Sequence, residues 1–248
     1  MSRTVLRVFR TYGLRGVAAL LLYGVVLRWV RWLNRILPSG RRACPACGWE
    51  GFSFEPLFHE TFFRRGARCP RCGSLERQRG LFLFLQGHLP ARLAGERPFL
   101  QLGPDRAISD LLRGRSARAW GLDRRPFGDV RGDAARLPFR DGAFGTAIAL
   151  HVLDYLDDPQ AGLAELSRVV APGGTLLLQV PRIPGGAPRV RCVIARQPIW
   201  RFGDGFEDDL RALGFEVSAE NPGGAATPGD RARYGLESKP LLVCRRAP

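Results

Sequence analysis

FLQLGPDRAISDLLRGRSARAWGLD, residues 99–123, is the stretch that decides the fold. Its first five residues predict a short buried strand that ends at Gly103, and residues 117–123 predict a second strand that ends at Asp123. Residues 105–112 between them predict a helix. A strand, a helix and a second apolar strand predict a βαβ unit, in which the two strands run parallel.

The same alternation continues toward the C-terminus. Further strands are predicted at residues 146–150, 175–180, 215–219 and 240–244, and further helices at residues 159–170 and 205–213. Residues 182–203 are basic and apolar by turns and predict a substrate lid, whereas residues 221–227 predict a loop. This order predicts an α/β domain with a parallel sheet and helices on both of its faces.

Asp123 is the first candidate binding residue of this sheet. It lies 20 residues after Gly103, close to the spacing at which an acidic side chain reaches ribose hydroxyls in nucleotide-binding sheets. In open α/β sheets, ligands bind at the carboxyl ends of the strands. The sequence therefore predicts a nucleoside-containing ligand at this edge.

Upstream of the sheet, the pattern Cys-Pro-x-Cys-Gly occurs twice, at residues 44–48 and 69–73. Each copy predicts a tight turn in which two thiolates converge and the glycine permits close backbone approach. The four candidate ligands are Cys44, Cys47, Cys69 and Cys72. Four thiolates complete tetrahedral Zn²⁺, so we expect a structural metal with no open position. A redox dithiol is the competing interpretation, but redox pairs occur singly, and the paired spacing favours a reducing, cytoplasmic compartment.

The aromatic residues between the two patterns suit a ribbon hairpin, within which His59 is a strand or surface residue rather than a ligand. A helix capped by Ser74 follows, and its Arg77 and Arg79 are expected on a solvated face or against an acidic substrate. Cys192 and Cys244 match no pattern and are expected to be inert. The predicted domains are an N-terminal helix at residues 1–40, the zinc ribbon with its linking helix at 41–90, and the sheet domain at 91–248.

The N-terminal helix is unusually apolar. Residues 16–27 carry no charge, but twelve helical residues span only about 18 Å, short of the roughly 30 Å hydrocarbon core. No small-x-small cleavage site follows, which disfavours a signal peptide. Two interpretations of residues 1–37 remain. One is an interfacial helix in peripheral contact with a membrane, and the other is a helix that docks on the protein itself or on a second copy.

The excess of positive charge, +15 overall, is concentrated in the N-terminal third. Residues 1–90 contain 15 arginines and 4 acidic residues. Such a field attracts nucleic acid or an anionic membrane. However, the chain has a single lysine, Lys239, which indicates a compositional bias toward arginine, so nucleic acid is possible but not favoured as a partner.

An ordered set of motifs runs through the sheet domain. It comprises Asp133, Leu137-Pro138-Phe139, Asp141-Gly142, Phe144, His151-Val152-Leu153, residues 165–170 (ELSRVV) and Pro172-Gly173-Gly174. With the strand order, this set resembles the class I S-adenosylmethionine-dependent methyltransferases, in particular the type 11 branch. Residues 69–77 resemble a zinc-ribbon element that precedes some members of this branch. The resemblance implies a Rossmann-like methyltransferase sheet and covers roughly residues 42–248.

The resemblance also implies a role for individual residues. Gly103, Pro104 and Asp105 would form the turn that the methionine end of S-adenosyl-L-methionine approaches, and Asp123 would bind its ribose. Asp133 and Ala134 would contact the adenine, and Leu150 and His151 would face the methyl group. The chain departs from the family where Gln101 replaces an acidic residue, where a single glycine stands in the first motif, and where Gly145 replaces an aspartate.

Methyl transfer from a sulfonium mainly requires alignment, and a base is needed only when the acceptor must lose a proton. His151 and Tyr155 are the candidate catalytic residues. The predicted function is methyl transfer to an unidentified acceptor, with a small molecule, lipid or sugar favoured. One alternative is an RNA or protein methyltransferase that docks through its zinc ribbon. The other is a non-catalytic binding protein on the same fold.

Overall fold

The computed structural model describes residues 3–37, 40–59, 62–92, 97–115, 118–183, 189–194, 197–223, 226–236 and 239–248. The chain divides into two compact units. The ribbon unit comprises Met1–Leu83 with Ala225–Glu237, and the sheet unit comprises Phe84–Gly224 with Ser238–Pro248. This division places the N-terminal helix and the ribbon in one unit and adds residues 225–237 to it, and the expected limits at residues 40 and 90 stay a prediction.

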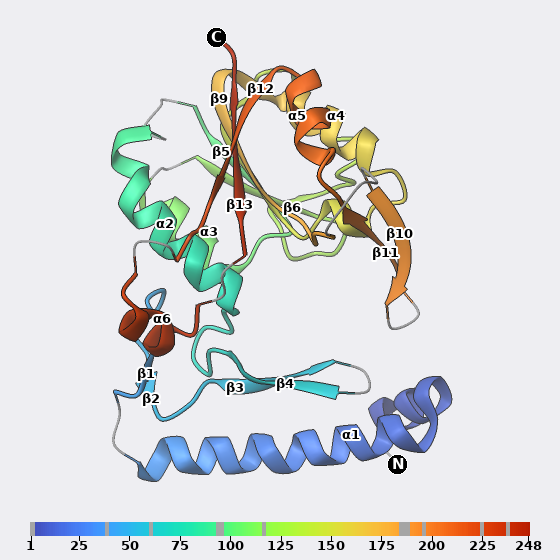
Figure 1. The fold of residues 1–248 in the computed structure, drawn as a ribbon, viewed down its shortest axis with the longest axis vertical. Coiled ribbons are helices and arrows are strands. Elements are labelled where there is room, and N and C mark those ends of the chain that lie inside the picture. Colours follow the sequence, from blue (N-terminus) through green and yellow to red (C-terminus); the bar gives the residue numbers. More distant parts are fainter. Residues whose placement is uncertain are drawn as a thin grey trace. The chain divides into compact units, whose positions relative to one another are not determined.

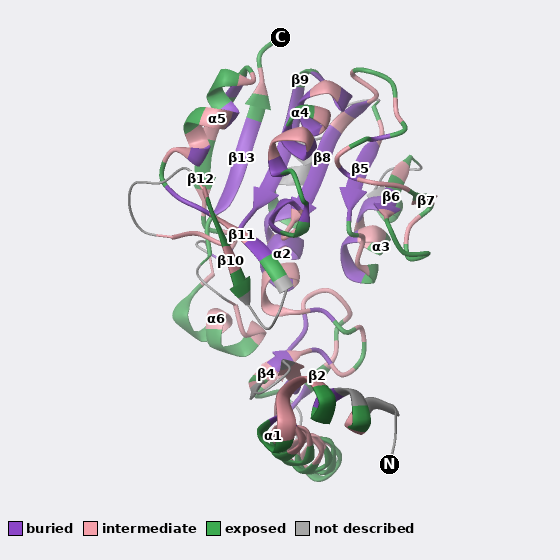
Figure 2. Cartoon of the chain, turned by 90° about the vertical axis from the view of Figure 1, so that its right-hand side faces the viewer, coloured by how far each residue is buried: buried purple, intermediate pink, exposed green. Residues whose placement is uncertain are grey.

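A seven-stranded sheet forms the centre of the sheet unit (Figure 1), in the order β12-β13-β9-β8-β5-β6-β7 (Figure 2). The strands are β5 Phe99–Leu102, β6 Ala119–Asp123, β7 Val130–Arg131, β8 Phe144–Leu150, β9 Val170–Gln179, β12 Phe215–Glu220 and β13 Leu241–Arg246. Strands β7, β6, β5, β8 and β9 pair in parallel, whereas β13 runs antiparallel to both β9 and β12. The Rossmann-like sheet and the βαβ unit of residues 99–123 are confirmed.

Helices cover both faces of this sheet. Helices α4 (Pro159–Val169) and α5 (Phe206–Ala212) lie on one side and α3 (Arg106–Arg115) on the other (Figure 1). The central strands are therefore buried on both faces, as Figure 2 shows, which explains why they are continuous apolar runs in the sequence. Helix α4 begins where the Asp158 side chain accepts the backbone N–H groups of Gln160 and Ala161.

The segment predicted as a lid contains an antiparallel hairpin of β10 (Arg189–Ile194) and β11 (Gln197–Phe202). Its residues 184–188 and 195–196 lie outside the described residues. The hairpin is fixed to the sheet unit because the Trp200 indole N–H donates to the Leu156 carbonyl at 2.9 Å. A short 3-10 helix, η1 (Leu153–Tyr155), follows β8.

The ribbon unit contains two small hairpins and three helices. Strands β1 (Arg42–Ala43) and β2 (Glu50–Gly51) form one hairpin, and β3 (Glu55–His59) and β4 (Phe62–Arg68) form the other. The helices are α1 (Arg3–Ile36), α6 (Pro228–Tyr234) and the first part of α2 (Glu76–Arg92), which continues into the sheet unit. Helix α1 is broken at Gly13, whose φ is 63°. Helix α6 was not expected, because its seven residues carry no apolar periodicity.

Candidate functional site

The strand order reverses between β5 and β8. In chain order, β5, β6 and β7 progress toward one edge, and β8 and β9 progress toward the other. Such a switch point separates the loops that follow the two neighbouring strands, and it is where doubly wound sheets bind ligands. A cavity of about 620 Å³ opens there, at the carboxyl ends of β5, β6 and β8. Its lining includes Gly103, Asp123, Arg124, Arg125, Phe127, Ala134, His151, Val152, Tyr155 and Pro198.

Gly103 makes the turn that opens this cavity. Its φ of 59° lies in the left-handed region, and a Cβ there would stand 3.3 Å from a Val152 methyl group. Its N–H donates to the Leu122 carbonyl at 2.9 Å, which ties the end of β5 to β6. The backbone after β5 is therefore held close to the cavity by a residue with no side chain to fill it.

Pro104 and Asp105, predicted beside Gly103, do not line the cavity. The Pro104 ring is so close to Gly121 that a Cβ on that glycine would lie 2.9 Å away. The Asp105 carboxylate accepts the Ile108 N–H at 3.1 Å and thus caps the start of α3. Both residues shape the turn without lining the cavity, and their contact with the cofactor stays a prediction.

Gln101, which departs from the family pattern, is buried with both ends of its amide bonded. Its Nε2 donates to Asp105 Oδ2 at 3.1 Å, and its Oε1 accepts the Ser109 hydroxyl at 2.9 Å. If residue 101 carried a carboxylate instead, it would lie about 3.1 Å from the Asp105 carboxylate. The acidic group is therefore present in this chain, but on the turn rather than on the strand.

Asp123 ends β6 at the cavity, as predicted from its spacing. Its Oδ1 accepts the Arg125 backbone N–H at 2.7 Å, which fixes the carboxylate. Among the described residues, its Oδ2 has no hydrogen-bond partner. A fixed carboxylate with one unused oxygen is suited to accept ribose hydroxyls.

Asp133 and Ala134 lie on the loop after β7. Ala134 is buried and lines the cavity, whereas Asp133 does not. The Asp133 carboxylate accepts the Ala135 N–H at 2.9 Å and pairs with Arg124 at 2.7 Å. The Ala135 N–H, and then Arg124, hold the pKa of Asp133 below its ordinary value despite partial burial. Its predicted contact with adenine stays a prediction.

His151 follows β8 in an unusual backbone conformation. Its φ of 53° makes it the one non-glycine residue with positive φ among those that the structure describes. Its Nδ1 lies 3.6 Å from Oδ2 of the buried Asp154, whose Oδ1 has no partner among the described residues. Such strain is typical of functional positions. Tyr155 also lines the cavity and is 57 % exposed. Leu150 is the last residue of β8, directly before His151.

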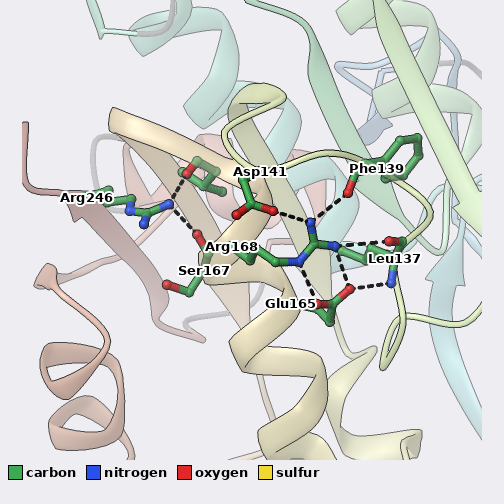
Figure 3. Close-up of polar contacts among 8 residues, drawn as sticks. Leu137, Phe139, Asp141, Glu165, Ser167, Arg168 and Arg246 are labelled. Carbon is green, nitrogen blue, oxygen red and sulfur yellow. Dashed lines mark hydrogen bonds and ion pairs between the residues drawn. The ribbon is translucent and has the colours of Figure 1, made fainter.

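The motif residues that carry the family resemblance fasten the loop after β7 to α4, as Figure 3 shows. The Arg168 guanidinium donates to the carbonyls of Leu137 and Phe139. It also pairs with Glu165 and Asp141, each at 2.7 Å, and these pairs raise the pKa of Arg168 above its ordinary value. The Glu165 carboxylate in turn accepts the Leu137 N–H. These residues position the cavity wall and do not line the cavity themselves.

The four predicted cysteines form a compact cluster in the ribbon unit, with all sulfurs within 4.8 Å of one another. The Cys44–Cys72 and Cys47–Cys69 sulfur distances are both 3.7 Å. Zinc–sulfur bonds of about 2.3 Å in a tetrahedron place the sulfurs about 3.8 Å apart, so the cluster fits Zn²⁺. Gly48 and Gly73 have φ of 68° and 79°, which confirms that the glycine of each pattern closes its turn.

The electrostatics of the cluster are compatible with a bound cation. A hydrogen bond from Cys69 lowers the pKa of Cys44 to about 4, whereas that same interaction, together with burial, raises the pKa of Cys69. Burial raises the pKa of Cys47 to about 11. Four crowded sulfurs thus do not ionise together unless a metal neutralises them. Ser74, predicted as a helix cap, instead places its hydroxyl 3.3 Å from the Cys44 sulfur.

Arg79 corrects the expectation of a solvated residue, because it is fully buried. Its guanidinium lies 3.9 Å from the Phe54 ring centre and donates to the carbonyls of Ala67, Ser74, Tyr234 and Gly235. Burial lowers the pKa of Arg79, and the Glu76 carboxylate, followed by the nearby cysteine sulfurs, counteracts this effect. This residue joins the second cysteine turn to the segment that carries α6. Its apolar sequence neighbours gave no sign of that distant segment.

Sequence reasoning missed Arg124, Arg125 and Phe127 at the cavity, and Asp154, which faces His151. The acidic residue three positions after His151 and the basic pair directly after Asp123 were the available signals. Phe127 carried none, because a lone aromatic residue in a loop resembles any surface residue.

Comparison with known proteins agrees with this geometry. Residues 110–178 match the family model described as "Methyltransferase domain". A 62-residue stretch is 37 % identical to ajmaline N-methyltransferase of Rauvolfia serpentina, covering 25 % of this chain and 21 % of that protein. An 87-residue stretch is 39 % identical to demethylmenaquinone methyltransferase of Beutenbergia cavernae, covering 35 % of each. The chain thus spans about a third or less of the length of these relatives.

Among solved structures, the chain is similar to 1,6-didemethyltoxoflavin-N1-methyltransferase of Burkholderia thailandensis, solved with 1,6-didemethyltoxoflavin and S-adenosylhomocysteine. The identity is 18 %, the TM-score is 0.48, and the match covers 69 % of this chain and 78 % of that one.

Proposed function

From the premise that this chain carries a class I S-adenosylmethionine-dependent methyltransferase domain, we propose that it binds S-adenosyl-L-methionine in the Asp123 cavity and methylates a small molecule. The observation that carries the proposal is the unused Oδ2 of Asp123 at the switch point of the sheet. The cavity volume lies within the roughly 300–1,000 Å³ of small-molecule sites. Gly103 leaves room at the strand end for the other end of the cofactor.

Each wall of the cavity has a part in this binding. Asp123 accepts the ribose hydroxyls through Oδ2 while the Arg125 N–H holds Oδ1. Ala134 packs against the adenine base of the cofactor. Its loop is held by the bonds from Arg168 to the carbonyls of Leu137 and Phe139, which we call the Arg168 clamp. The bound cofactor supplies an electrophilic methyl group on a sulfonium. The protein contributes alignment of the acceptor with that methyl group, which supplies much of the rate in such displacements.

His151 is the proposed base for an acceptor that must lose a proton. Asp154 Oδ2 faces Nδ1, so it favours the tautomer with the proton on Nδ1 and leaves Nε2 to accept. Tyr155 and Phe127, both exposed at the cavity, offer flat apolar surfaces to the acceptor. The names of the two curated relatives, one acting on ajmaline chemistry and one on a menaquinone precursor, support a small organic acceptor.

Calorimetric titration with S-adenosyl-L-methionine tests the cofactor site on the full chain. Asp123→Ala removes the ribose acceptor, and we expect binding to weaken by about 30-fold to 300-fold, the value of one or two charge-assisted hydrogen bonds. Asp110→Asn is the matched control, since that exposed carboxylate lies on α3 away from the cavity. Equal affinities in the wild type and Asp123→Ala would refute the site. Absence of binding by the wild type would favour a non-catalytic protein.

We propose three further properties of this chain. The cysteine cluster holds structural Zn²⁺, the chain acts in the cytoplasm, and the ribbon is not the docking site for an RNA substrate. Retention on RNA that falls steeply with salt and requires the ribbon arginines would support the RNA alternative instead.

A further inference from the structure

One face of α1 is used inside the ribbon unit. The Tyr23 ring lies 5.4 Å from the Phe58 ring of β3, and Arg31 pairs with the buried Glu55 at 2.7 Å. The Asn34 side chain both donates to and accepts from the Ser53 backbone. These contacts hold the helix along the β3–β4 hairpin.

The opposite face of α1 is apolar and exposed. Its large side chains recur every three or four residues and thus form one stripe, which we call the α1 stripe: Leu21, Leu22, Val25, Trp29, Trp32 and Ile36. Each is between 41 % and 63 % exposed. The two tryptophans stack edge to face at 5.4 Å and, with Val25 and Arg28, line a shallow groove. A continuous stripe of this kind marks an interaction surface.

The charge on α1 indicates what covers the stripe. Residues 3–36 contain seven arginines and no acidic residue. Arg28 and Arg35 are exposed beside the stripe and form no ion pair with any residue that the structure describes. Pairing with a second copy would bring these arginines together without a counter-charge, which is unfavourable. An anionic surface instead satisfies the arginines and the apolar stripe at once.

The geometry also sets how the helix meets a membrane. By length and composition alone, the stretch Val8–Ile36 could cross a bilayer. A span of about 20 residues within this stretch would, however, carry at least two arginines into hydrocarbon and separate Tyr23 from Phe58 of β3. Tryptophan and arginine side by side are typical of the membrane–water interface. A helix that lies in the plane of the surface keeps both sets of contacts.

We propose that α1 binds the surface of an anionic lipid membrane through the α1 stripe, with Arg28 and Arg35 contacting lipid headgroups. This inference does not depend on the cofactor site, because it rests only on the ribbon unit. It places the protein where a membrane-dissolved acceptor would be available.

Cosedimentation of the full chain with vesicles tests the proposal. We expect binding to vesicles of phosphatidylcholine with 30 % phosphatidylglycerol and at least tenfold weaker binding to phosphatidylcholine alone. Trp29→Ala with Trp32→Ala should weaken binding at least tenfold through lost apolar contact, whereas Trp120→Ala, an exposed tryptophan on β6, should not. Arg28→Gln with Arg35→Gln should weaken it about tenfold or more, unlike the exposed pair Arg140→Gln with Arg245→Gln.

Quenching by brominated lipids provides a second measurement, since only a buried indole is quenched. We expect strong quenching in the wild type and little after the Trp29→Ala and Trp32→Ala changes. Equal binding to neutral and anionic vesicles, or binding that survives both double variants, would overturn the proposal. So would a dimer in sedimentation velocity that the tryptophan variant dissociates in the absence of vesicle binding, which would assign the stripe to a second copy.

Discussion

The cysteine cluster and the Asp123 cavity are both binding sites, but their residues are brought together over different ranges of the chain. Each cysteine turn is complete within five residues, and its glycine closes it locally. The cavity instead needs the ends of three strands and the loop after β7. A locally encoded site can be located from spacing alone, whereas an assembled site can be located only as far as the fold is known.

Metal removal should have the largest effect and would test whether the cluster organises its surroundings. Structural zinc contributes on the order of 10 kcal/mol to small domains, so Cys69→Ser or strong chelation should unfold the hairpins of the ribbon unit. Bound zinc by mass spectrometry and protease sensitivity within residues 40–74 measure this. Cys192→Ser, outside the cluster, should retain one zinc per chain. A chain purified with full zinc occupancy despite Cys69→Ser would rule out the four-sulfur site.

Arg79→Met tests how local the ribbon site is. It removes the guanidinium that donates to the carbonyls of residues 67, 74, 234 and 235, so we expect a loss of about 3–5 kcal/mol in the free energy of unfolding. Urea denaturation measures it, with the partly exposed Arg77→Met as the control. A loss no larger than that of the control would show that the cysteine turns stand without residues 225–237.

Gln101→Glu tests the hydrogen bonds that Gln101 forms beside the cavity. It would oppose two carboxylates across the 3.1 Å that now joins Gln101 to Asp105, and we expect about 1–2 kcal/mol of destabilisation at neutral pH. The double variant Gln101→Glu with Asp105→Asn, which moves the acid to the strand, should recover most of this loss. Thermal unfolding at pH 7 measures both. If Gln101→Glu alone gained stability, the network would not explain the departure from the family.

The Arg168 clamp should make stability depend on acid pH by a smaller amount. Arg168, followed by the Leu137 N–H, holds the pKa of Glu165 below its ordinary value. The resulting stabilisation is present above about pH 4.5 and is lost as pH falls through the lowered pKa, a change of about 1 kcal/mol. Urea denaturation between pH 6 and pH 3 measures it. Arg168→Met should reduce the change in the free energy of unfolding between pH 6 and pH 3. An unchanged pH dependence would show that the Arg168–Glu165 pair is not its cause.

Much of the fold followed from the sequence because its signals are local. The central strands are apolar on both faces, Pro159 follows a capping aspartate, and two identical cysteine patterns occur in series. Of the site, Asp123, Gly103, Ala134, His151 and Tyr155 were expected at the cavity edge and line it. Pro104, Asp105, Asp133 and Leu150 do not, because a strand-end position fixes where the backbone goes and not which way a side chain turns.

The features that sequence reasoning missed depend on partners distant in the chain. Arg168 was recognised as part of a motif, but its bonds to carbonyls 29 and 31 residues away have no spacing signature. Arg79 resembled any helix arginine, since four backbone carbonyls from three segments define its burial. The α6 helix is short and lacks apolar periodicity, so its position depends on contacts with other parts of the ribbon unit.

The return of residues 225–237 to the ribbon unit has a consequence for synthesis. A chain leaves the ribosome from its N-terminus, and domains usually fold in that order. Here the first cysteine turns emerge early, yet the carbonyls of Tyr234 and Gly235 that bind Arg79 are made 155 and 156 residues after it. The ribbon unit is therefore completed only shortly before β13 adds to the sheet unit, and a nascent chain that stalls before residue 225 retains an unfinished ribbon.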